Sequence, residues 1–141
     1  MKPDHTVVPR ETGMVRIYLK PSDQGPKTGS WKRFFSGNPL YRELVVRAKA
    51  DGIMNAVAHH THFGFSNNGP VRSDGAEYRD PHLTMCVELI GPRDELAAFC
   101  ARHGALLSGK VVVYKHLEHW TIDESGVHPE DAPLEELKAQ S

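Results

Sequence analysis

Apolar positions recur in four short runs whose composition is typical of β-strands. The first run, residues 14–19 (MVRIYL), combines β-branched and aromatic side chains and ends before Pro21, which predicts a strand. Three further runs of the same character lie between glycine- or proline-containing segments, at residues 53–65, 83–90 and 110–114. The sequence LEHWTI, residues 117–122, is a candidate continuation of the last strand.

Helical spacing of apolar residues appears between the first and second runs. Asn38 and Pro39 suit the N-terminal cap and the first position of a helix. The residues that follow place one apolar face inward, formed by Leu40, Tyr41, Leu44, Val45 and Ala48. Gly52 can adopt the left-handed conformation that closes a helix. The pattern therefore predicts a helix over about residues 39–51.

A second helical stretch begins after Gly91 and Pro92, and we expect Gly104 to end it. Its inward stripe comprises Leu96, Phe99, Cys100 and His103. The complete order is then β-α-β-β-α-β. This order predicts an α+β fold of the ferredoxin-like type, a four-stranded antiparallel sheet with two helices on one face.

The same order predicts that the other face of the sheet has no cover of its own. Exposed apolar sheet surface is unfavourable by about 25 cal/mol per Å², so we expect copies of the chain to associate through this face. The domain is expected at residues 13–122. Residues 1–12 and the acidic residues 123–141 are interpreted as tails, because neither has a sustained apolar period.

Charge and composition narrow the classes of function. Lys and Arg number 17 against 18 acidic residues, which gives no electrostatic support for binding nucleic acid. Cys86 and Cys100 lack CxxC spacing, and no apolar run is long enough for membrane insertion, so we expect a reducing, cytoplasmic location. Neither a GxSxG turn nor an HExxH helix is present. We therefore expect a binding protein rather than an enzyme.

Several short strings resemble the PII-like signalling proteins. They are RIYL at residues 16–19, the Gly37, Pro39, Leu40 and Tyr41 pattern before the first helix, and Gly64–Phe65 at the end of the second strand. The resemblance runs in order over roughly residues 13–115. It implies a ferredoxin-like homotrimer with small-molecule effector sites in the clefts between subunits. It further implies a flexible loop after the second strand, here residues 66–81, that contacts a target protein. Classical PII proteins bind adenine nucleotides in these clefts.

The nine histidines include a cluster at residues 59–62. On a strand, His60 and His62 would share one face with about 7 Å between their Cα atoms, a spacing that suits a shared metal ion. The same imidazoles would contact an anionic ligand equally well. The two interpretations, a divalent metal site and an anion site, remain open at this point, and the ligand itself is not identified by any motif.

Other candidate ligand-binding residues are cationic or lie on long loops. They are Gly64 at the end of the second strand, Arg72 and Arg79 on the loop, Lys110 and Lys115 on the last strand, and His116 and His119 beyond it. Our leading hypothesis is a regulatory protein that binds a small anionic effector, with an adenine nucleotide as candidate, and signals through loop 66–81. The alternative is a histidine-based metal-binding protein or metal-dependent enzyme on the same trimeric fold.

Overall fold

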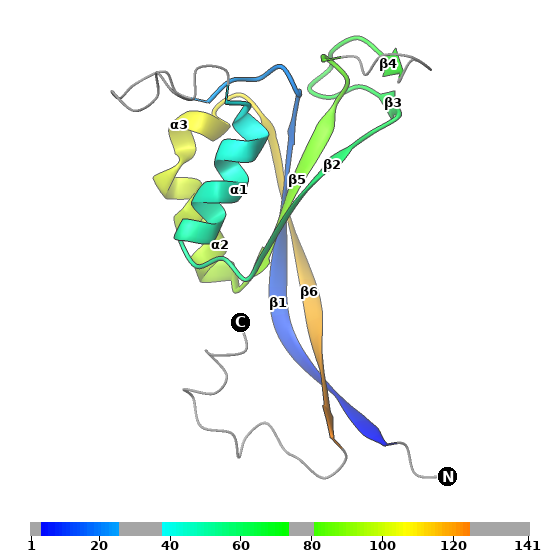
Figure 1. Cartoon of the computed structure of the whole chain (residues 1–141), viewed down its shortest axis with the longest axis vertical. Helices are drawn as coiled ribbons and strands as arrows, with labels where there is room; N and C mark the ends of the chain where they lie inside the picture. The colour runs from blue at the N-terminus through cyan, green and yellow to red at the C-terminus, as the bar shows by residue number, and fades with distance from the viewer. Residues whose placement is uncertain (1–3, 26–37, 74–80, 125–141) are drawn as a thin grey trace.

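The computed structural model describes residues 4–25, 38–73 and 81–124. Its long strands and helices alternate as the apolar pattern predicts (Figure 1). In chain order the elements are β1 (His5–Leu19), α1 (Leu40–Ala50), β2 (Asn55–His60), β3 (Phe63–Gly64), β4 (Arg72–Ser73), β5 (Met85–Gly91), α2 (Arg93–Arg102), α3 (Gly104–Leu107) and β6 (Val111–Glu124).

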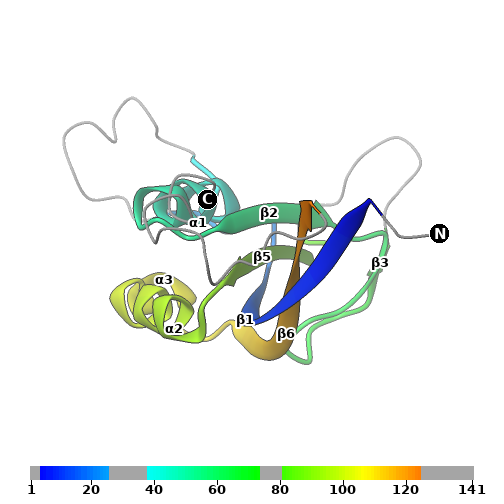
Figure 2. The same ribbon diagram turned by 90° about the horizontal axis from the view of Figure 1, so that it is seen from below.

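The four long strands form one sheet in the order β2-β5-β1-β6, and every neighbouring pair is antiparallel. The helices lie together on one side of this sheet (Figure 2). The predicted α+β, ferredoxin-like arrangement is therefore confirmed. The structure adds the short helix α3 and a separate two-stranded sheet, β3–β4, which the sequence did not predict.

The hydrophobic core lies between the helices and one face of the sheet. Alternate residues of β1, Val15, Ile17 and Leu19, point to this side and are at most 4% exposed. They pack with buried residues of β5 and of the helices: Met85, Val87, Leu89, Leu40, Leu44, Ala48, Leu96, Phe99 and Leu107. Burying one such leucine or phenylalanine stabilises the fold by about 1.5–3 kcal/mol, so this layer fixes the sheet against the helices.

The start of α1 differs in detail from the prediction, whereas α2 begins directly after Pro92 as predicted. Pro39 is the N-terminal cap of α1 rather than its first residue, and the side-chain amide of Asn38 donates to Oε2 of Glu43 at 2.9 Å instead of capping the backbone. The end of α1 is as predicted, because Gly52 has φ 78° directly after Asp51. The expected inward face of α1 is confirmed by the burial of Leu40, Leu44 and Ala48.

The second helix ends earlier and is followed by another. Helix α2 stops at Arg102, and Gly104 begins α3 rather than closing the helix. The left-handed glycine is instead Gly109, with φ 76°, which stands just before β6. The prediction for Gly104 was wrong because the apolar residues after it continue as a helical turn, and glycine adopts helical as readily as left-handed backbone angles.

The predicted second strand, residues 53–65, is two strands. Strand β2 ends at His60, where the hydroxyl of Thr61 donates to the backbone carbonyl of Thr84 and the chain bends. Strand β3 then pairs with β4, so Phe63 lies opposite Ser73 and Gly64 opposite Arg72. Residues 72–73, within loop 66–81, therefore form a strand, although the sequence predicted neither a strand nor a helix there.

Strands β1 and β6 extend far beyond the helices as a two-stranded ribbon (Figure 1). Residues 5–12 of β1 pair with residues 117–124 of β6. The prediction that residues 1–12 are a tail is wrong for residues 5–12, and residues 123–124 likewise belong to β6. Pro9 does not interrupt the ribbon, because a strand paired on one side needs no N–H on its other side. The continuation of the last strand through residues 117–122 is confirmed.

Candidate functional site

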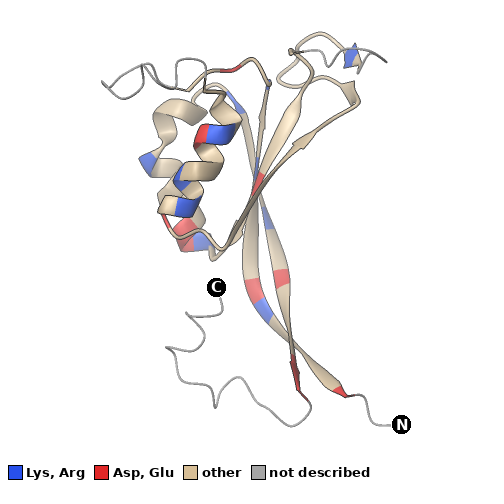
Figure 3. Ribbon diagram, viewed as in Figure 1, with Lys and Arg blue, Asp and Glu red and all other residues tan. Residues whose placement is uncertain are grey.

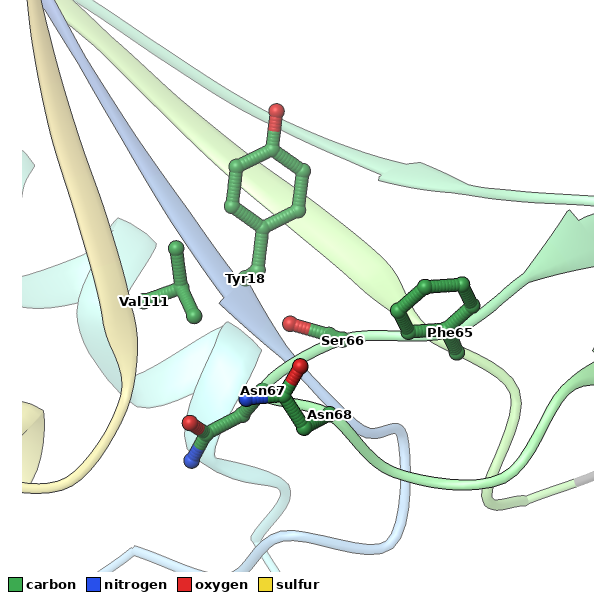
Figure 4. Close-up of a pocket in the computed structure, with 6 residues that line it drawn as sticks. All are labelled: Tyr18, Phe65, Ser66, Asn67, Asn68 and Val111. Carbon is green, nitrogen blue, oxygen red and sulfur yellow. The ribbon is translucent and has the colours of Figure 1, made fainter.

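A surface cleft of about 390 Å³ lies where the chain after β3 passes β1 and β6. Its lining residues are Tyr18, Phe65, Ser66, Asn67, Asn68 and Val111, and Figure 4 shows the loop residues facing Tyr18 and Val111. Tyr18 and Val111 are direct partners in the β1–β6 register. The sheet therefore supplies one side of the cleft and the loop supplies the other.

The loop side of the cleft is a tight turn. The backbone N–H of Gly69 donates to the carbonyl of Ser66 at 3.0 Å, and the two residues between them, Asn67 and Asn68, have φ 52° and 55°. Two successive positive φ angles define a turn of type I′, in which asparagine is favoured because its side chain tolerates the left-handed region. The turn places two side-chain amides, each with donor and acceptor atoms, in the lining of the cleft.

Lys110 precedes the cleft residue Val111 in the chain but does not itself line the cleft. Its Nζ lies 3.3 Å from Oδ2 of Asp23, and the same oxygen accepts the backbone N–H of Lys20 at 2.9 Å. The sequence predicted Lys110 as a donor to an anionic ligand. In the structure, its ammonium already has a carboxylate partner, so an anion in the cleft would share this lysine with Asp23.

The face of the sheet without helices carries an ion-pair network at its centre. Oε1 of Glu88 lies 2.9 Å from Nε of Arg16, its register partner, and Oε2 lies 3.2 Å from Nε2 of His59. The phenol of Tyr18 and then the charge of Glu88 raise the pKa of Arg16. The uncovered face is therefore less apolar than the sequence predicted. Its apolar residues, including Val57 and Val113, surround a charged centre.

The remaining predicted ligand residues fall into two groups. His60, His62, Gly64 and Arg72 lie on or between β2, β3 and β4, at the same end of the sheet as the cleft. His60 contacts the ring of Tyr41, with 6.3 Å between the ring centroids. Arg79 lies outside the described residues.

Lys115, His116 and His119 form the second group, on the exposed part of β6. Nε2 of His116 lies 3.6 Å from Oε1 of Glu11 on the neighbouring strand. At about 3.3 Å per residue, His119 is roughly 30 Å along the strand from Lys110. The structure therefore does not bring the predicted residues together within one chain.

The structure of the single chain does not support the metal site predicted at His60 and His62. Because β2 ends at His60 and the chain bends at His62, the strand alternation that would put both imidazoles on one face does not apply. Within the ranges that the structure describes, no group of three or more His, Cys, Asp and Glu side chains could hold a metal ion. Metal binding by His60 and His62 stays a prediction.

The cleft was not predicted from the sequence, because its lining residues form no recognisable ligand-binding motif. Tyr18 and Val111 are typical strand residues, and only the register brings them side by side. The one available signal was the string SNNG at residues 66–69, which was interpreted as a loop but not as a turn of defined type. None of the helices among the described residues is long and apolar enough to cross a membrane.

The sheet order and the helices on one face define a ferredoxin-like domain. The chain belongs to the DUF190 family, described as "Uncharacterized ACR, COG1993", whose model matches residues 13–119. The resemblance to PII-like proteins seen in the sequence is thereby confirmed. No curated protein sequence matches the chain.

Solved structures with the same fold include CPII, a nitrogen regulatory PII-like protein from Thiomonas intermedia K12. A CPII structure bound to ADP, AMP and bicarbonate matches with a TM-score of 0.50 and 10% identity, over 81% of this chain and 91% of CPII. The apo form of CPII matches with a TM-score of 0.47 and 10% identity, over 82% and 99% of the two chains. A PII-like signalling protein from Thermus thermophilus matches with a TM-score of 0.45 and 14% identity, over 82% and 91%.

Proposed function

We propose that this chain is a regulatory protein that binds a small anionic effector, with an adenine nucleotide as the first candidate, in the cleft beside Tyr18. The observation that carries the proposal is the cleft itself, which combines aromatic rings, side-chain amides and a neighbouring lysine. The family and the fold support a PII-like role, and the CPII structure with ADP and AMP makes the adenine nucleotides the first ligands to test. We infer binding rather than catalysis.

Each part of the cleft suits one part of such a ligand. The rings of Tyr18 and Phe65 offer faces on which a base can stack. The amides of Asn67 and Asn68 can both donate to and accept from the edge of a base. Lys110, the chain neighbour of Val111, would contact phosphate if its ammonium turned from Asp23 toward the cleft.

The second group of predicted residues supports a site between copies of the chain. Lys115, His116 and His119 lie too far along β6 to reach the cleft of their own chain. A neighbouring copy can supply Lys115 if the chains associate, as the uncovered sheet face favours. We therefore propose a homotrimer with its effector sites at the subunit boundaries.

Signalling would pass through the turn that lines the cleft. Asn67 and Asn68 belong both to the ligand-lining surface and to loop 66–81. A ligand that contacts these residues binds one arrangement of the loop more tightly and shifts the population toward it. A target protein that contacts the loop would then respond to effector occupancy.

Isothermal titration calorimetry with AMP, ADP, ATP, bicarbonate and ZnCl₂ tests the proposal. Phe65 and Phe63 form a matched pair, because both are exposed phenylalanines two residues apart and only Phe65 lines the cleft. We expect Phe65→Ala to weaken adenine-nucleotide binding about tenfold and Phe63→Ala to leave it unchanged. If no nucleotide binds at millimolar concentration, the proposal is wrong. A response to zinc alone that is lost in His60→Ala would favour the metal-binding alternative.

A further inference from the structure

The β1–β6 ribbon is the part of the fold that the family model covers least. Residues 5–12 precede the matched region, 13–119, and residues 120–124 follow it. The ribbon carries several large apolar side chains in water, and Val7, Trp120 and Ile122 are 48%, 59% and 58% exposed. A two-stranded ribbon is at best marginally stable alone in water. The ribbon therefore needs a surface to pack against.

The register divides the ribbon into two faces of different character. One face, here called the acidic face, carries the cross-strand pairs Val7–Ile122, Pro9–Trp120 and Glu11–Glu118. The opposite face, here called the basic face, has the pair Arg10–His119 at its centre, between Val8–Thr121 and Thr12–Leu117, with Thr6–Asp123 nearer the end of the ribbon. Figure 3 shows an acidic and a basic position next to each other on β1, below the helices.

The acidic face has an unfavourable pair within its own chain. Glu11 and Glu118 are direct cross-strand partners, and like charges in this position destabilise a sheet. His116 lies 3.6 Å from Glu11, and the indole of Trp120 donates to Glu118 at 3.0 Å. The carboxylate of Glu11 nevertheless remains 85% exposed. A partner for this face should supply positive charge beside apolar surface.

The basic face of another copy has both properties. Arg10 and His119 are adjacent across the ribbon, and Val8 and Leu117 lie next to them on the same face. We propose that the ribbons of neighbouring copies pack together, the acidic face of one against the basic face of the next. Glu118 then contacts Arg10 of the next copy, and Trp120 is removed from water. The inference rests on the self-association part of the proposed function.

The contact is heterologous, since the two surfaces that meet are different. Such contacts close into a ring when the rotation between copies allows it. A ring gives every ribbon the same environment and leaves no acidic face uncovered. The ribbon would thus add a contact to the association of the sheet faces, formed in part by residues outside the family-matched region.

Charge reversal tests the contact in the full-length chain by sedimentation velocity over a concentration series. We expect Glu118→Lys and Arg10→Glu each to weaken association about tenfold, because each places like charges in contact. The double variant should restore association, since every contact then joins Lys to Glu. Within one chain these residues lie on opposite faces, so restoration cannot arise from an internal pair. Circular dichroism checks that each variant is folded.

The same variants also show whether the ribbon contact is absent. If the contact does not exist, Glu118→Lys relieves the repulsion with Glu11 and leaves association unchanged or stronger, which would overturn the inference. Trp120→Ser should weaken association about tenfold, while Val46→Ser, at an apolar position of α1 that is 64% exposed, should not. Association that withstands all ribbon variants would refute the ribbon contact alone. A wild-type protein that remains a single chain would refute the proposed trimer as well.

Discussion

The side-chain amide of Asn67 donates a hydrogen bond of 3.0 Å to the backbone carbonyl of Gly109. The bond joins the turn after β3 to the turn before β6, two segments far apart in the sequence. Both residues have positive φ, 52° for Asn67 and 76° for Gly109. The position of the loop side of the cleft relative to the sheet therefore depends on two left-handed residues and one side-chain bond.

We expect Asn67→Ala to destabilise the protein more than Asn67→Gly. Alanine loses the bond to Gly109 and is also disfavoured at φ 52°, for a total of about 2 kcal/mol. Glycine loses only the bond, at about 1 kcal/mol, because it tolerates the left-handed region. Urea unfolding measures the difference. Equal losses would mean that the conformation of the turn is not held by the fold.

Gly13 is predicted to be intolerant of a side chain. A Cβ at this position would lie 2.7 Å from Cζ of Tyr114. The guanidinium carbon of Arg93 lies over the same ring, 5.3 Å from its centroid. Gly13→Ala would displace this ring and destabilise the protein by about 1–3 kcal/mol. Urea unfolding with Gly25→Ala is the control, because a Cβ there has ordinary contacts of 3.6 Å. Tyr114→Leu added to Gly13→Ala should recover part of the loss.

The elements that the sequence predicted best are those determined by local patterns. Leu40, Leu44 and Ala48 recur at helical spacing, and all three are buried in α1. The predicted third strand, residues 83–90, corresponds to β5, whose near-continuous apolar run suits its central place in the sheet. In both cases the residues carry the signal within a window of about ten positions.

The ribbon and the cleft depend on pairings that no local window contains. Residues 5–12 include Pro9, Arg10 and Glu11 and have little apolar character, and they become a strand because residues 117–124 pair with them. The cleft likewise requires the register that places Tyr18 beside Val111. The charged centre of the uncovered sheet face was not predicted either, because Arg16 and Glu88 are 72 residues apart in the sequence.

Both cysteines should react slowly with thiol reagents in the folded protein. Burial raises the pKa of Cys86, with a further increase from the charge of Glu88, and burial raises the pKa of Cys100. A raised pKa lowers the thiolate fraction, which is the reactive form. Labelling with Ellman's reagent at pH 8 should be slow until urea unfolds the chain. Ser108→Cys, at an exposed position, is the control and should react at once.

Asp51 should make stability depend on pH in the acid range. Its carboxylate Oδ2 lies 2.8 Å from both Nε2 of His103 and Nη1 of Arg102. The hydrogen bond from His103 and then the charge of Arg102 lower the pKa of Asp51. The folded state thus binds the proton less readily than the unfolded state. The stabilisation is complete above the ordinary aspartate pKa of about 3.9 and is lost as the pH falls through the lowered folded value.

Urea unfolding of Asp51→Asn between pH 2 and pH 7 would check this dependence. We expect the variant to be less stable than the wild type at neutral pH, and the difference to shrink as the pH falls below about 4. Asp4→Asn, at an exposed carboxylate just before β1, is the control and should show a smaller difference at every pH. A difference for Asp51→Asn that is the same at every pH would mean that the charge of Asp51 contributes nothing, and that only the shape of its side chain matters for joining α1 to α2.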